Sequence, residues 1–337
     1  MIREAIQALV TGKLLTMDEA SQVMDEIMEG QVTPAQFGAF VTALRLKGET
    51  VDEISGMAKV MRAKAIRVTV ADPVIDIVGT GGDGLNSFNI STVTAFVVAG
   101  AGLKVAKHGN RAASSQCGAA DVLEALSVKF NLNAEQVQKC IEEVGIGFMF
   151  APTFHPAMKY AGPPRREIGI RTVFNILGPL TNPAWATHYL LGVADGALVE
   201  KMALALKSLG CNHALVVHGE DGLDEITISG PSQVCELKGG RLKKYTVKPE
   251  DFGISTAGLD TLKGGTAEEN AAFLRSVLWG DKGPRRDVVL MNAAAALVAG
   301  DKAKTIKQGM DLATESINSG QALAKLEHLI KLSNTFT

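Results

Sequence analysis

The sequence contains few aromatic residues, few cysteines and almost no excess charge. Phe, Trp and Tyr make up 5% of the chain, and its 35 glycines outnumber them. A β-sandwich is expected to carry more aromatic side chains, so this composition favours an α/β protein with many tight turns. At 337 residues, the chain is long enough for two domains or one large one.

The charges nearly cancel. The 34 Lys and Arg residues face 36 Asp and Glu residues, for a formal net charge of −2. A chain without a broad basic field does not attract nucleic acid as a general partner, and we expect none. Any polyanionic ligand must therefore be held by a local cluster of cations.

The cysteines are widely spaced and none forms a CxxC pair: Cys117, Cys140, Cys211 and Cys235. This usage argues against a zinc site and fits a reducing compartment. Arg3, Glu4 and Lys13 interrupt the N-terminal region, so it does not form the apolar core of a secretory signal. The most apolar run, residues 95–103, is too short to span a bilayer. We expect a cytoplasmic protein with no membrane partner.

The first 70 residues predict a small helical domain. Ile2, Ile6 and Leu9 recur at helical spacing. Three capping boxes follow, each a Thr with Glu or Gln three residues later: Thr16 with Glu19, Thr33 with Gln36, and Thr50 with Glu53. Pro34 occupies the first helical position, which proline favours. Residues 1–70 are thus expected to form a bundle of four short amphipathic helices.

Beyond Asp72 the pattern changes to alternating strands and helices. Short apolar runs predict strands at 74–78, 103–106, 146–150, 189–193 and 214–217. Helical patterns are found at 93–98, 119–126, 134–144, 197–209 and 287–299, and after the capping pair Thr266 and Glu269. The alternation predicts a larger α/β domain with a mostly parallel central sheet and helices around it.

Two regions depart from this alternation. Strand-like runs separated by Gly-Pro and Gly-Gly predict antiparallel strands at a sheet edge, at 226–228, 233–237 and 242–247. Residues 155–187 are rich in Pro and Arg, and we expect them to return to the helical bundle. The α/β domain would then comprise residues 72–154 and 188–337.

Glycines and a carboxylate follow the first predicted strand, in the segment Gly79-Thr-Gly-Gly-Asp83. Glycines after a strand let the backbone approach a ligand closely and turn N–H groups toward an anion. The pattern is neither a GxGxxG fingerprint nor a P-loop, and it also fits an ordinary tight turn. Residues 89–92 (Asn-Ile-Ser-Thr) precede the apolar helix at 93–98, where their hydroxyls can cap a helix N-terminus that attracts anions.

A cationic loop, Lys107-His-Gly-Asn-Arg-Ala-Ala-Ser-Ser115, follows the second predicted strand. Lys107 and Arg111 supply positive charge, and Ser114 and Ser115 can donate hydrogen bonds to a phosphate. A loop with two cations is usually only solvated surface. Two such loops at the carboxyl ends of successive strands, however, stand where open α/β sheets collect ligands. Together they predict a cradle for a phosphorylated sugar.

Paired carboxylates occur in Gly222-Leu-Asp-Glu225, after the strand at 214–217. Adjacent carboxylates on a loop can hold one or two hard cations, although the same residues also make an ordinary charged turn. A pyrophosphate ligand requires Mg²⁺, and the chain offers no better pair of carboxylates at a predicted strand end. Ser91 can add a hydroxyl ligand.

Residues 159–166 form a cationic segment stiffened by two prolines. Arg165 or Arg166 can clamp a substrate carboxylate through two hydrogen bonds, or the segment can be plain surface. His108 is the only histidine inside a candidate site loop. The other histidines are expected to serve structure or to lie on the surface: His155, His188, His213, His218 and His328.

Taken in order, these segments resemble the anthranilate phosphoribosyltransferases. The resemblance rests on GTGGD at 79–83, NIST at 89–92, KHGNRAASS at 107–115, RREIGIRTVFNILGPLTNPA at 165–184 and GLDE at 222–225. Each motif is weak alone, but their order and spacing match over essentially the whole chain. The resemblance implies transfer of phosphoribose from phosphoribosyl pyrophosphate to the amine of anthranilate in tryptophan biosynthesis. It also implies a homodimer formed through the helical domain.

The resemblance further implies roles for individual residues. Phosphoribosyl pyrophosphate would be held by Gly79, Gly82, Asp83, Ser87, Asn89, Ile90, Ser91, Thr92, Lys107, His108, Gly109, Asn110, Arg111, Ala112, Ala113, Ser114, Ser115 and Ala119. Anthranilate would contact Gly79, Asn110 and Arg165. Two Mg²⁺ ions per subunit would be ligated by Ser91, Asp224 and Glu225. The expected catalytic residues are Lys107, His108 and Arg165.

The chain departs from the commonest family pattern at a few positions. Ala119 replaces a frequent serine beside the phosphate loop, so only its backbone can contribute there. Cys117 and Pro164 are also less usual. These differences bear on local affinity and leave the resemblance intact.

Two alternatives share this architecture. Pyrimidine nucleoside phosphorylases are generally longer, with an added C-terminal domain, and their basic loop lacks the His-Gly-Asn triplet at 108–110. A non-catalytic, nucleic-acid-binding relative would need a basic stripe, and the net charge of −2 argues against one.

Overall fold

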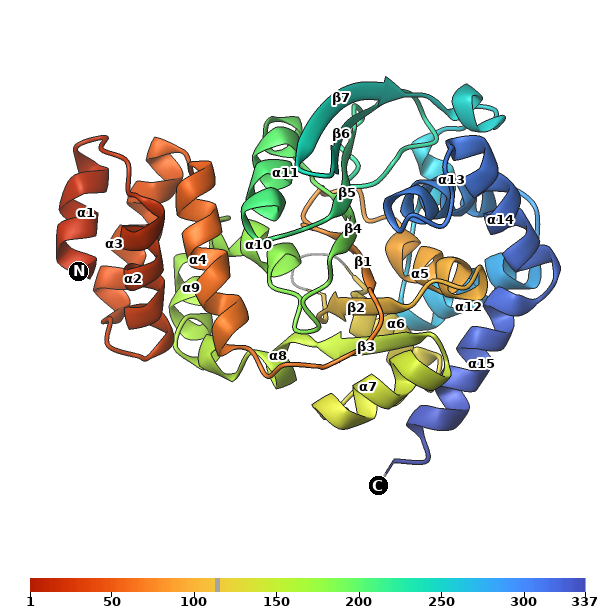
Figure 1. Cartoon of the computed structure of the whole chain (residues 1–337), viewed down its shortest axis with the longest axis horizontal. Helices are drawn as coiled ribbons and strands as arrows, with labels where there is room; N and C mark the ends of the chain where they lie inside the picture. Colours follow the sequence, from red (N-terminus) through yellow and green to blue (C-terminus); the bar gives the residue numbers. More distant parts are fainter. Residues whose placement is uncertain (113–115, 337) are drawn as a thin grey trace.

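The computed structural model describes residues 1–112 and 116–336. Four helices stand at one end of the molecule, and a sheet surrounded by further helices makes up the rest (Figure 1). The expected α/β architecture with an N-terminal helical bundle is therefore confirmed. Among the residues described, no helix has the length and hydrophobicity needed to cross a bilayer.

The N-terminal bundle consists of α1 (Ile2–Val10), α2 (Met17–Met28), α3 (Pro34–Lys47) and α4 (Val51–Lys64). All three predicted capping boxes form, so each Thr hydroxyl accepts the backbone N–H three residues on. Phe40 and Met57 are fully buried, and burial of such a side chain contributes on the order of 2–3 kcal/mol. Gly56 lets α4 approach α2 closely, because a Cβ there would clash with the carbonyl oxygen of Met17.

The chain that follows the third strand packs against this bundle. It forms α8 (Ala151–Phe154), α9 (Gly162–Ile168), α10 (Phe174–Leu177) and the 3₁₀ turns η1 (Pro156–Lys159) and η2 (Gly178–Leu180). The ring centroids of Phe37 and Phe174 lie 5.3 Å apart. Buried Arg62 of α4 donates to the carbonyl oxygen of Leu180 at 2.8 Å and to the hydroxyl of Tyr189 at 2.9 Å. These contacts join the bundle to the sheet.

One seven-stranded sheet runs through the larger part, in the order β3-β2-β1-β4-β5-β6-β7. Its strands are β1 (Ile75–Gly79), β2 (Val105–Gly109), β3 (Ile146–Phe150), β4 (His188–Gly192), β5 (His213–Gly219), β6 (Ser232–Lys238) and β7 (Arg241–Val247). The strands β3, β2, β1, β4 and β5 are parallel, and β6 and β7 add an antiparallel edge. The mostly parallel sheet is thus confirmed, with strand bounds shifted by a few residues.

The strand expected at 226–228 is wrong. The N–H of Ile226 donates to Oδ1 of Asn292 at 3.0 Å, and the N–H of Thr227 donates to Oγ of Ser232 at 2.9 Å. Buried side chains therefore satisfy this backbone in place of a neighbouring strand. The other two runs of that region are β6 and β7, as expected.

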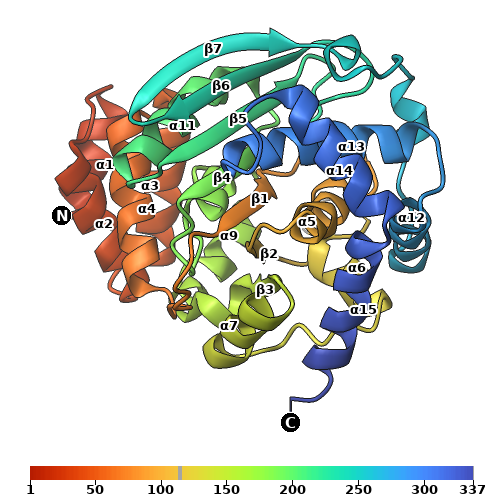
Figure 2. The ribbon, with the colours of Figure 1, turned by 45° about the vertical axis from the view of Figure 1, so that its right-hand side comes forward.

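Helices cover the sheet on both sides (Figure 2). They are α5 (Ile90–Gly100), α6 (Ala119–Ala125), α7 (Ala134–Glu143), α11 (Val199–Ser208), α12 (Ala267–Trp279), α13 (Pro284–Ala299), α14 (Ile306–Asn318) and α15 (Gln321–Ser333), with the 3₁₀ turns η3 (Gly196–Leu198), η4 (Pro249–Phe252) and η5 (Leu259–Leu262). Helix α5 packs against β1 on one side and against α13 and α15 on the other, so it is apolar all round. Helix α11 packs between β5 and α4.

Candidate active site

The candidate site lies at the carboxyl ends of the parallel strands. In the order β3-β2-β1-β4-β5, the chain turns from β1 to β2 on one side and resumes at β4 on the other. Such a switch point opens a crevice outside the strand ends, where α/β proteins bind ligands. The glycine-rich segment follows β1, the cationic loop follows β2 and the paired carboxylates follow β5. The topology thus brings three separate motifs to one edge of the sheet.

The glycine-rich segment forms a tight loop against β4 and the paired carboxylates. The N–H of Thr80 donates to the carbonyl oxygen of Gly192 at 3.0 Å. The N–H of Gly81 donates to Oδ2 of Asp224 at 2.7 Å. Gly81 and Gly82 have φ values of 67° and 73°, which favour glycine. A Cβ at Gly79 would clash with Oδ2 of Asp224, so this close approach also requires glycine.

Lys107 is buried at the centre of this edge. Its Nζ donates to the carbonyl oxygen of Ile77 at 2.6 Å and to Oγ of Ser91 at 3.2 Å. Burial lowers the pKa of Lys107, and the negative charges of Asp76, Glu225 and Asp224 oppose that shift. The ammonium therefore sits among carboxylates, next to the Ser91 hydroxyl at the start of α5.

Asp224 and Glu225 form an acidic pair in which Glu225 is buried and Asp224 is half-buried. Burial, followed by the charge of Asp83, raises the pKa of Asp224 to about 6. Burial and the charge of Asp224 raise the pKa of Glu225 well above its usual value. A hydrogen bond from the backbone of Ser91 opposes that shift, so Ser91 and Glu225 are neighbours. Holding two negative charges side by side away from water costs free energy unless a cation compensates them.

The donor set fits Mg²⁺. Within the described residues, no group of three or more His, Cys, Asp or Glu side chains forms a complete metal cage. Mg²⁺ does not require one, since it is usually held by one or two carboxylates together with waters and substrate phosphates. The pair of oxygen-donor carboxylates, with the hydroxyl of Ser91 beside it, matches that preference.

The start of α5 differs from the sequence expectation. The helix begins at Ile90, so Ser91 and Thr92 lie in its first turn and do not precede it. Asn89, at the N-cap position, makes no side-chain cap hydrogen bond; its Nδ2 donates to the carbonyl oxygen of Cys117 at 3.1 Å. The buried Oγ1 of Thr92 has no hydrogen-bond partner among the described residues. Ser87 forms an isolated bridge with Lys263.

Arg111 forms salt bridges with two carboxylates of α6. Its Nη1 lies 2.7 Å from Oδ1 of Asp121 and 2.8 Å from Oε2 of Glu124, so two carboxylates offset its charge. Asp121 also accepts the backbone N–H groups of Ala112 and Gly118, each at 2.9 Å. The loop is therefore tied to the start of α6, where Ala119 is the first residue. Ala113, Ser114 and Ser115 lie outside the described residues.

Two buried histidines meet at the end of β2. The ring centroids of His108 and His155 lie 5.0 Å apart. Burial, and then the neighbouring ring, lowers the pKa of His108 to about 3; burial lowers that of His155 to about 4. Both imidazoles are therefore neutral near pH 7. His155, expected only to serve structure or lie on the surface, is buried beside a predicted site residue.

Arg165 lies in α9, within the segment that runs from β3 to the helical bundle. Its guanidinium stacks on the ring of Phe174, with Cζ 5.3 Å from the ring centroid. Burial lowers the pKa of Arg165, although the group stays charged near neutral pH. Phe174 in turn contacts Phe37 of α3, so aromatic packing holds this arginine in place.

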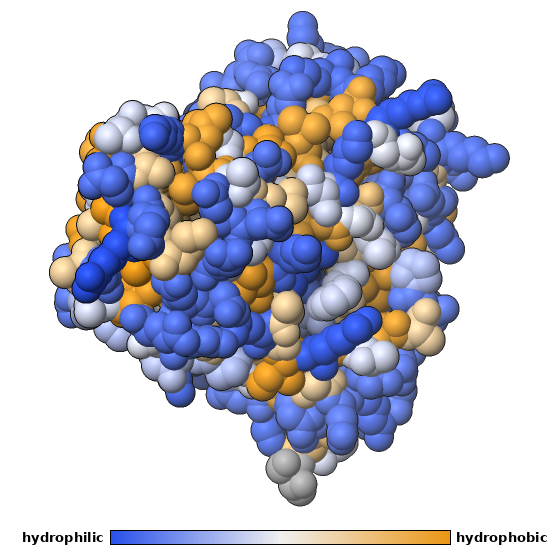
Figure 3. All heavy atoms as spheres, turned by 60° about the vertical axis from the view of Figure 1, so that its left-hand side comes forward, coloured by the Kyte–Doolittle hydropathy of each residue, from blue (hydrophilic) through white to orange (hydrophobic). Residues whose placement is uncertain are grey.

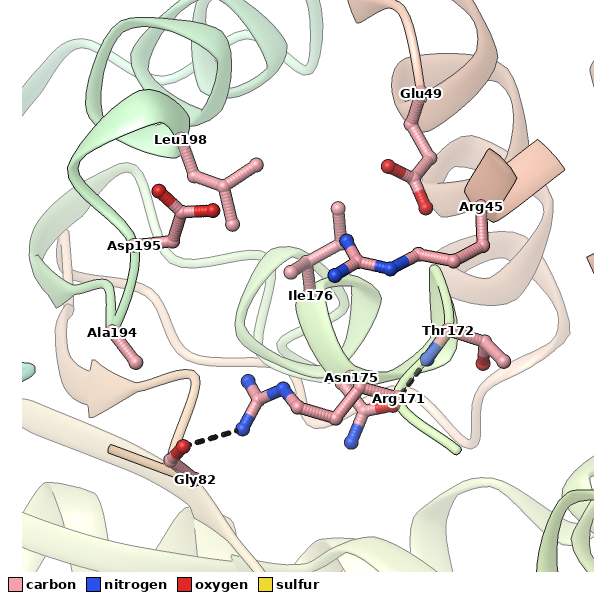
Figure 4. Close-up of a pocket in the computed structure, with 10 residues that line it drawn as sticks. All are labelled: Arg45, Glu49, Gly82, Arg171, Thr172, Asn175, Ile176, Ala194, Asp195 and Leu198. Carbon is pink, nitrogen blue, oxygen red and sulfur yellow. Dashed lines mark hydrogen bonds between the residues drawn. The ribbon is translucent and has the colours of Figure 1, made fainter. Parts of the chain in front are cut away.

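A cavity of about 180 Å³ lies beside the glycine-rich loop, between that loop and the end of α3 (Figure 4). Arg45 and Glu49 line it from the helical bundle, and Asp195 and Leu198 line it from the chain after β4. Arg171 reaches across to the loop: its Nη1 donates to the carbonyl oxygen of Gly82 at 2.8 Å. Its Nη2 donates to that of Gly81 at 3.0 Å.

Comparison with known proteins shows the family to which the chain belongs. Residues 3–65 match the glycosyl transferase family helical bundle domain, and residues 71–323 match the glycosyl transferase family a/b domain. The chain is 62% identical to an anthranilate phosphoribosyltransferase of Dehalococcoides mccartyi over 99% of both chains. It is 60% identical to that of Chloroflexus aggregans over 98% of both. The chain belongs to the anthranilate phosphoribosyltransferase family.

Solved structures of anthranilate phosphoribosyltransferases share the fold. The enzyme from Thermus thermophilus superposes with a TM-score of 0.93 at 46% identity, covering 98% of this chain and 99% of that one. The enzyme from Saccharomyces cerevisiae in complex with phosphoribosyl pyrophosphate and Mg superposes with a TM-score of 0.91 at 31% identity, covering 99% and 98%. The resemblance inferred from the ordered motifs is thereby confirmed.

Sequence reasoning missed three polar residues whose contacts hold the loops and strands at this edge of the sheet. Arg171 lies inside the segment 165–184 but was not singled out. Buried Asn182 donates to Oδ2 of Asp76 at 2.7 Å and to the carbonyl oxygen of Ala106 at 2.8 Å, which joins β1 to β2 beneath the site. Asp76 accepts the N–H of His108 at 3.3 Å. Asp76 itself was the signal in the sequence, because it lies within an otherwise apolar strand. A buried charge requires polar partners, so its position indicated that such partners must exist.

Proposed function

We propose that the protein catalyses the Mg²⁺-dependent transfer of 5-phosphoribose from phosphoribosyl pyrophosphate to the amine of anthranilate. The products are N-(5-phosphoribosyl)anthranilate and pyrophosphate, and the reaction belongs to tryptophan biosynthesis. The observation that carries this proposal is the meeting of the glycine-rich loop, Lys107 and the Asp224–Glu225 pair at one switch point of the sheet. The 62% identity to an anthranilate phosphoribosyltransferase over nearly the whole chain supports it.

For the donor, we infer binding across the loops after β1 and β2 and the start of α5. The backbone of Gly79, Gly82 and Asp83 and the first turn of α5 present N–H groups to phosphate oxygens. Lys107, whose charge interacts with those of Glu225 and Asp224, would stabilise negative charge on the departing pyrophosphate. The remaining donor contacts come from the residues assigned by the family resemblance.

For the metal, Asp224, Glu225 and the hydroxyl of Ser91 would hold Mg²⁺, with two ions per subunit. When bound, Mg²⁺ neutralises the pyrophosphate and acts as a Lewis acid on the leaving oxygen. Asp224 and Glu225 must then be ionised, and a cation favours that state over the protonated one. Binding would therefore offset the cost of holding two negative charges side by side in a site that is largely shielded from water.

For the acceptor, we infer that Arg165 binds the anthranilate carboxylate and that Asn110 and Gly79 orient the ring. The bond from C1 of ribose to pyrophosphate breaks with its electron pair leaving on pyrophosphate, and C1 acquires oxocarbenium character as in glycoside cleavage. The amine then forms the new C1–N bond on the opposite face and releases a proton. An aryl amine is already neutral near pH 7, so positioning contributes more than base catalysis.

The role of His108 follows from its protonation state. With a pKa near 3, the buried imidazole is a weak proton acceptor at neutral pH. Its Nε2 has no hydrogen-bond partner among the described residues. We infer that this nitrogen hydrogen-bonds substrate in the assembled site.

We also propose a cytoplasmic homodimer formed through the helical domain. Val10, Leu14 and Leu46 are 61%, 64% and 83% exposed on the bundle. Apolar atoms gather in places on the side of the molecule where the bundle comes forward (Figure 3), which supports a protein contact there. We take residues 1–70 with 155–187 as the helical domain, and 72–154 with 188–337 as the α/β domain.

Loss of anthranilate fluorescence tests the proposed function. The purified protein is mixed with anthranilate, phosphoribosyl pyrophosphate and Mg²⁺, with an EDTA control. Rapid loss that EDTA abolishes would establish donor, acceptor and metal together. No loss of fluorescence, with phosphorolysis of thymidine by phosphate instead, would overturn the proposal in favour of a nucleoside phosphorylase.

A further inference from the structure

We propose that Arg171 is a positioning residue that sets the shape of the donor loop and ties it to the segment carrying Arg165. The inference rests on the proposed function, because it gives the loop at 79–83 the task of binding phosphoribosyl pyrophosphate. Arg171 lies between α9 and α10, 89 positions after Gly82. Its guanidinium is exposed to the cavity and binds two consecutive carbonyl groups of the loop.

The contact fills space that only glycine leaves open. A Cβ at Gly82 would overlap Nη1 of Arg171, so the guanidinium stands where a side chain would otherwise be. The planar fork of arginine matches two carbonyl oxygens presented side by side, which the single ammonium of lysine cannot reproduce. Figure 4 shows Arg171 extended across the cavity floor toward Gly82.

Because the peptide group is planar, the contact with Arg171 also fixes the direction of the loop's N–H groups. In a planar trans peptide, a carbonyl oxygen and the following N–H point in opposite directions. Because Arg171 holds the carbonyl groups of Gly81 and Gly82, the N–H groups of Gly82 and Asp83 point away from the cavity that it lines. Those two N–H groups are then available to a phosphate oxygen on the other side of the loop. Arg171 thus acts on the donor through the backbone, without touching it.

The same segment also holds the proposed acceptor arginine. Arg165 precedes Arg171 in the chain and stacks on Phe174, which follows Arg171 in α10 and packs on Phe37. The N–H of Thr172 donates to Oδ1 of Asn175 in α10 at 2.9 Å, which ties the residue after Arg171 to that helix. A shift of this segment would therefore move the donor loop and the acceptor clamp together.

The chain offers a matched control in Arg45. Its guanidinium lines the same cavity, yet no hydrogen bond to the loop is found for it within the described residues. Arg45→Ala removes an equal charge from the cavity and leaves the loop contacts in place. Arg171→Lys keeps the charge and removes the fork.

The experiment compares steady-state kinetics of the wild type, Arg171→Ala, Arg171→Lys and Arg45→Ala at saturating Mg²⁺. Calorimetric binding of phosphoribosyl pyrophosphate and thermal melting are measured for each. We expect Arg171→Ala to raise the KM and the Kd for phosphoribosyl pyrophosphate by at least about tenfold, because two hydrogen bonds from a charged donor are lost. Arg171→Lys should recover part of that affinity, and Arg45→Ala should match the wild type. The KM for anthranilate should change less.

Several results would overturn the inference. One is an unchanged Kd for phosphoribosyl pyrophosphate in Arg171→Ala; another is an equal loss in Arg45→Ala, which would indicate simple charge attraction. Equal losses for both substrates with a lowered melting temperature would indicate a structural role only. The calorimetric Kd does not depend on turnover, so the two proposals can fail separately. If the wild type binds the donor but does not consume anthranilate, the proposed function is refuted. The Kd values of the variants would still test the role of Arg171.

Discussion

Oδ2 of Asp224 accepts a hydrogen bond from the backbone N–H of Gly81, with the two atoms 2.7 Å apart. The residues lie 143 positions apart in the chain, and each belongs to a different strand end. A proposed metal ligand is therefore in direct contact with the proposed donor loop. Because Mg²⁺ would compete for the same carboxylate oxygens, we expect metal binding and loop geometry to depend on each other.

Replacing Asp224 tests the metal assignment. Asp224→Asn keeps the shape of the side chain and an oxygen that can accept the N–H of Gly81, but it removes the charge. We expect turnover to fall by on the order of 100-fold, with the Mg²⁺ midpoint shifted to higher concentration. Initial rates over a Mg²⁺ titration would measure both. The control is Asp72→Asn, because Asp72 is an exposed carboxylate that pairs with Lys104 and has no proposed role in metal binding. Unchanged turnover and Mg²⁺ dependence would refute the metal role.

Replacing Arg165 tests the acceptor assignment. Arg165→Ala removes the guanidinium proposed to bind the anthranilate carboxylate, so the KM for anthranilate should rise about tenfold or more. The KM for phosphoribosyl pyrophosphate should change less. Arg275→Ala, which breaks only an exposed ion pair with Glu327, should behave as the wild type. If the donor KM alone increased, Arg165 would belong to the donor site.

Arg62 is expected to hold the helical bundle to the sheet. It is buried and donates to the carbonyl oxygens of Leu180 and Leu209 and to the hydroxyl of Tyr189. Arg62→Met leaves these acceptors without a donor and should lower the free energy of unfolding by on the order of 3 kcal/mol. Urea denaturation would measure the loss. Lys59→Met, on an exposed position of the same helix, should leave the midpoint nearly unchanged, and equal midpoints for both variants would contradict the prediction.

Asp76 should make stability depend on pH. Burial raises its pKa from 3.8 to about 6, against the opposing effects of Asn182 and Lys107. Between pH 3.8 and about pH 6, Asp76 is therefore mostly protonated in the folded chain and mostly ionised in the unfolded chain. The stabilisation is therefore fully present below about pH 4 and is lost as pH rises through 6, for a total of about 3 kcal/mol.

Urea unfolding from pH 4 to pH 7 would check this prediction with the wild type and Asp76→Asn. The stability difference between the two proteins should change by roughly that amount across the range, with the wild type gaining on acidification. Parallel stability curves would show that Asp76 has an ordinary pKa in the folded protein.

Sequence patterns predicted structure correctly where the stabilising contacts join residues that are close in the chain. The capping pairs Thr16 with Glu19 and Thr50 with Glu53 predicted helix starts that the structure confirms, because a cap joins atoms within one turn. The run at 226–228 misled, because its β-branched pattern says nothing about Asn292, which binds its backbone from 66 positions away. Likewise, Lys107 and Arg111 of the loop at 107–115 are expected from sequence to supply positive charge for a phosphate, yet in the structure Asp121 and Glu124 pair with Arg111.

The sequence by itself determined the helical bundle, the alternation that builds a parallel sheet, and the ordered motifs that indicate the family. The bundle and the alternation depend on residue spacing within short segments, and the family assignment depends on the order of short motifs along the chain. Only the tertiary structure decided that Arg171 binds the carbonyl groups of Gly81 and Gly82, and that His108 is neutral. These depend on burial and on contacts between distant segments, and such contacts exist only once the chain has packed.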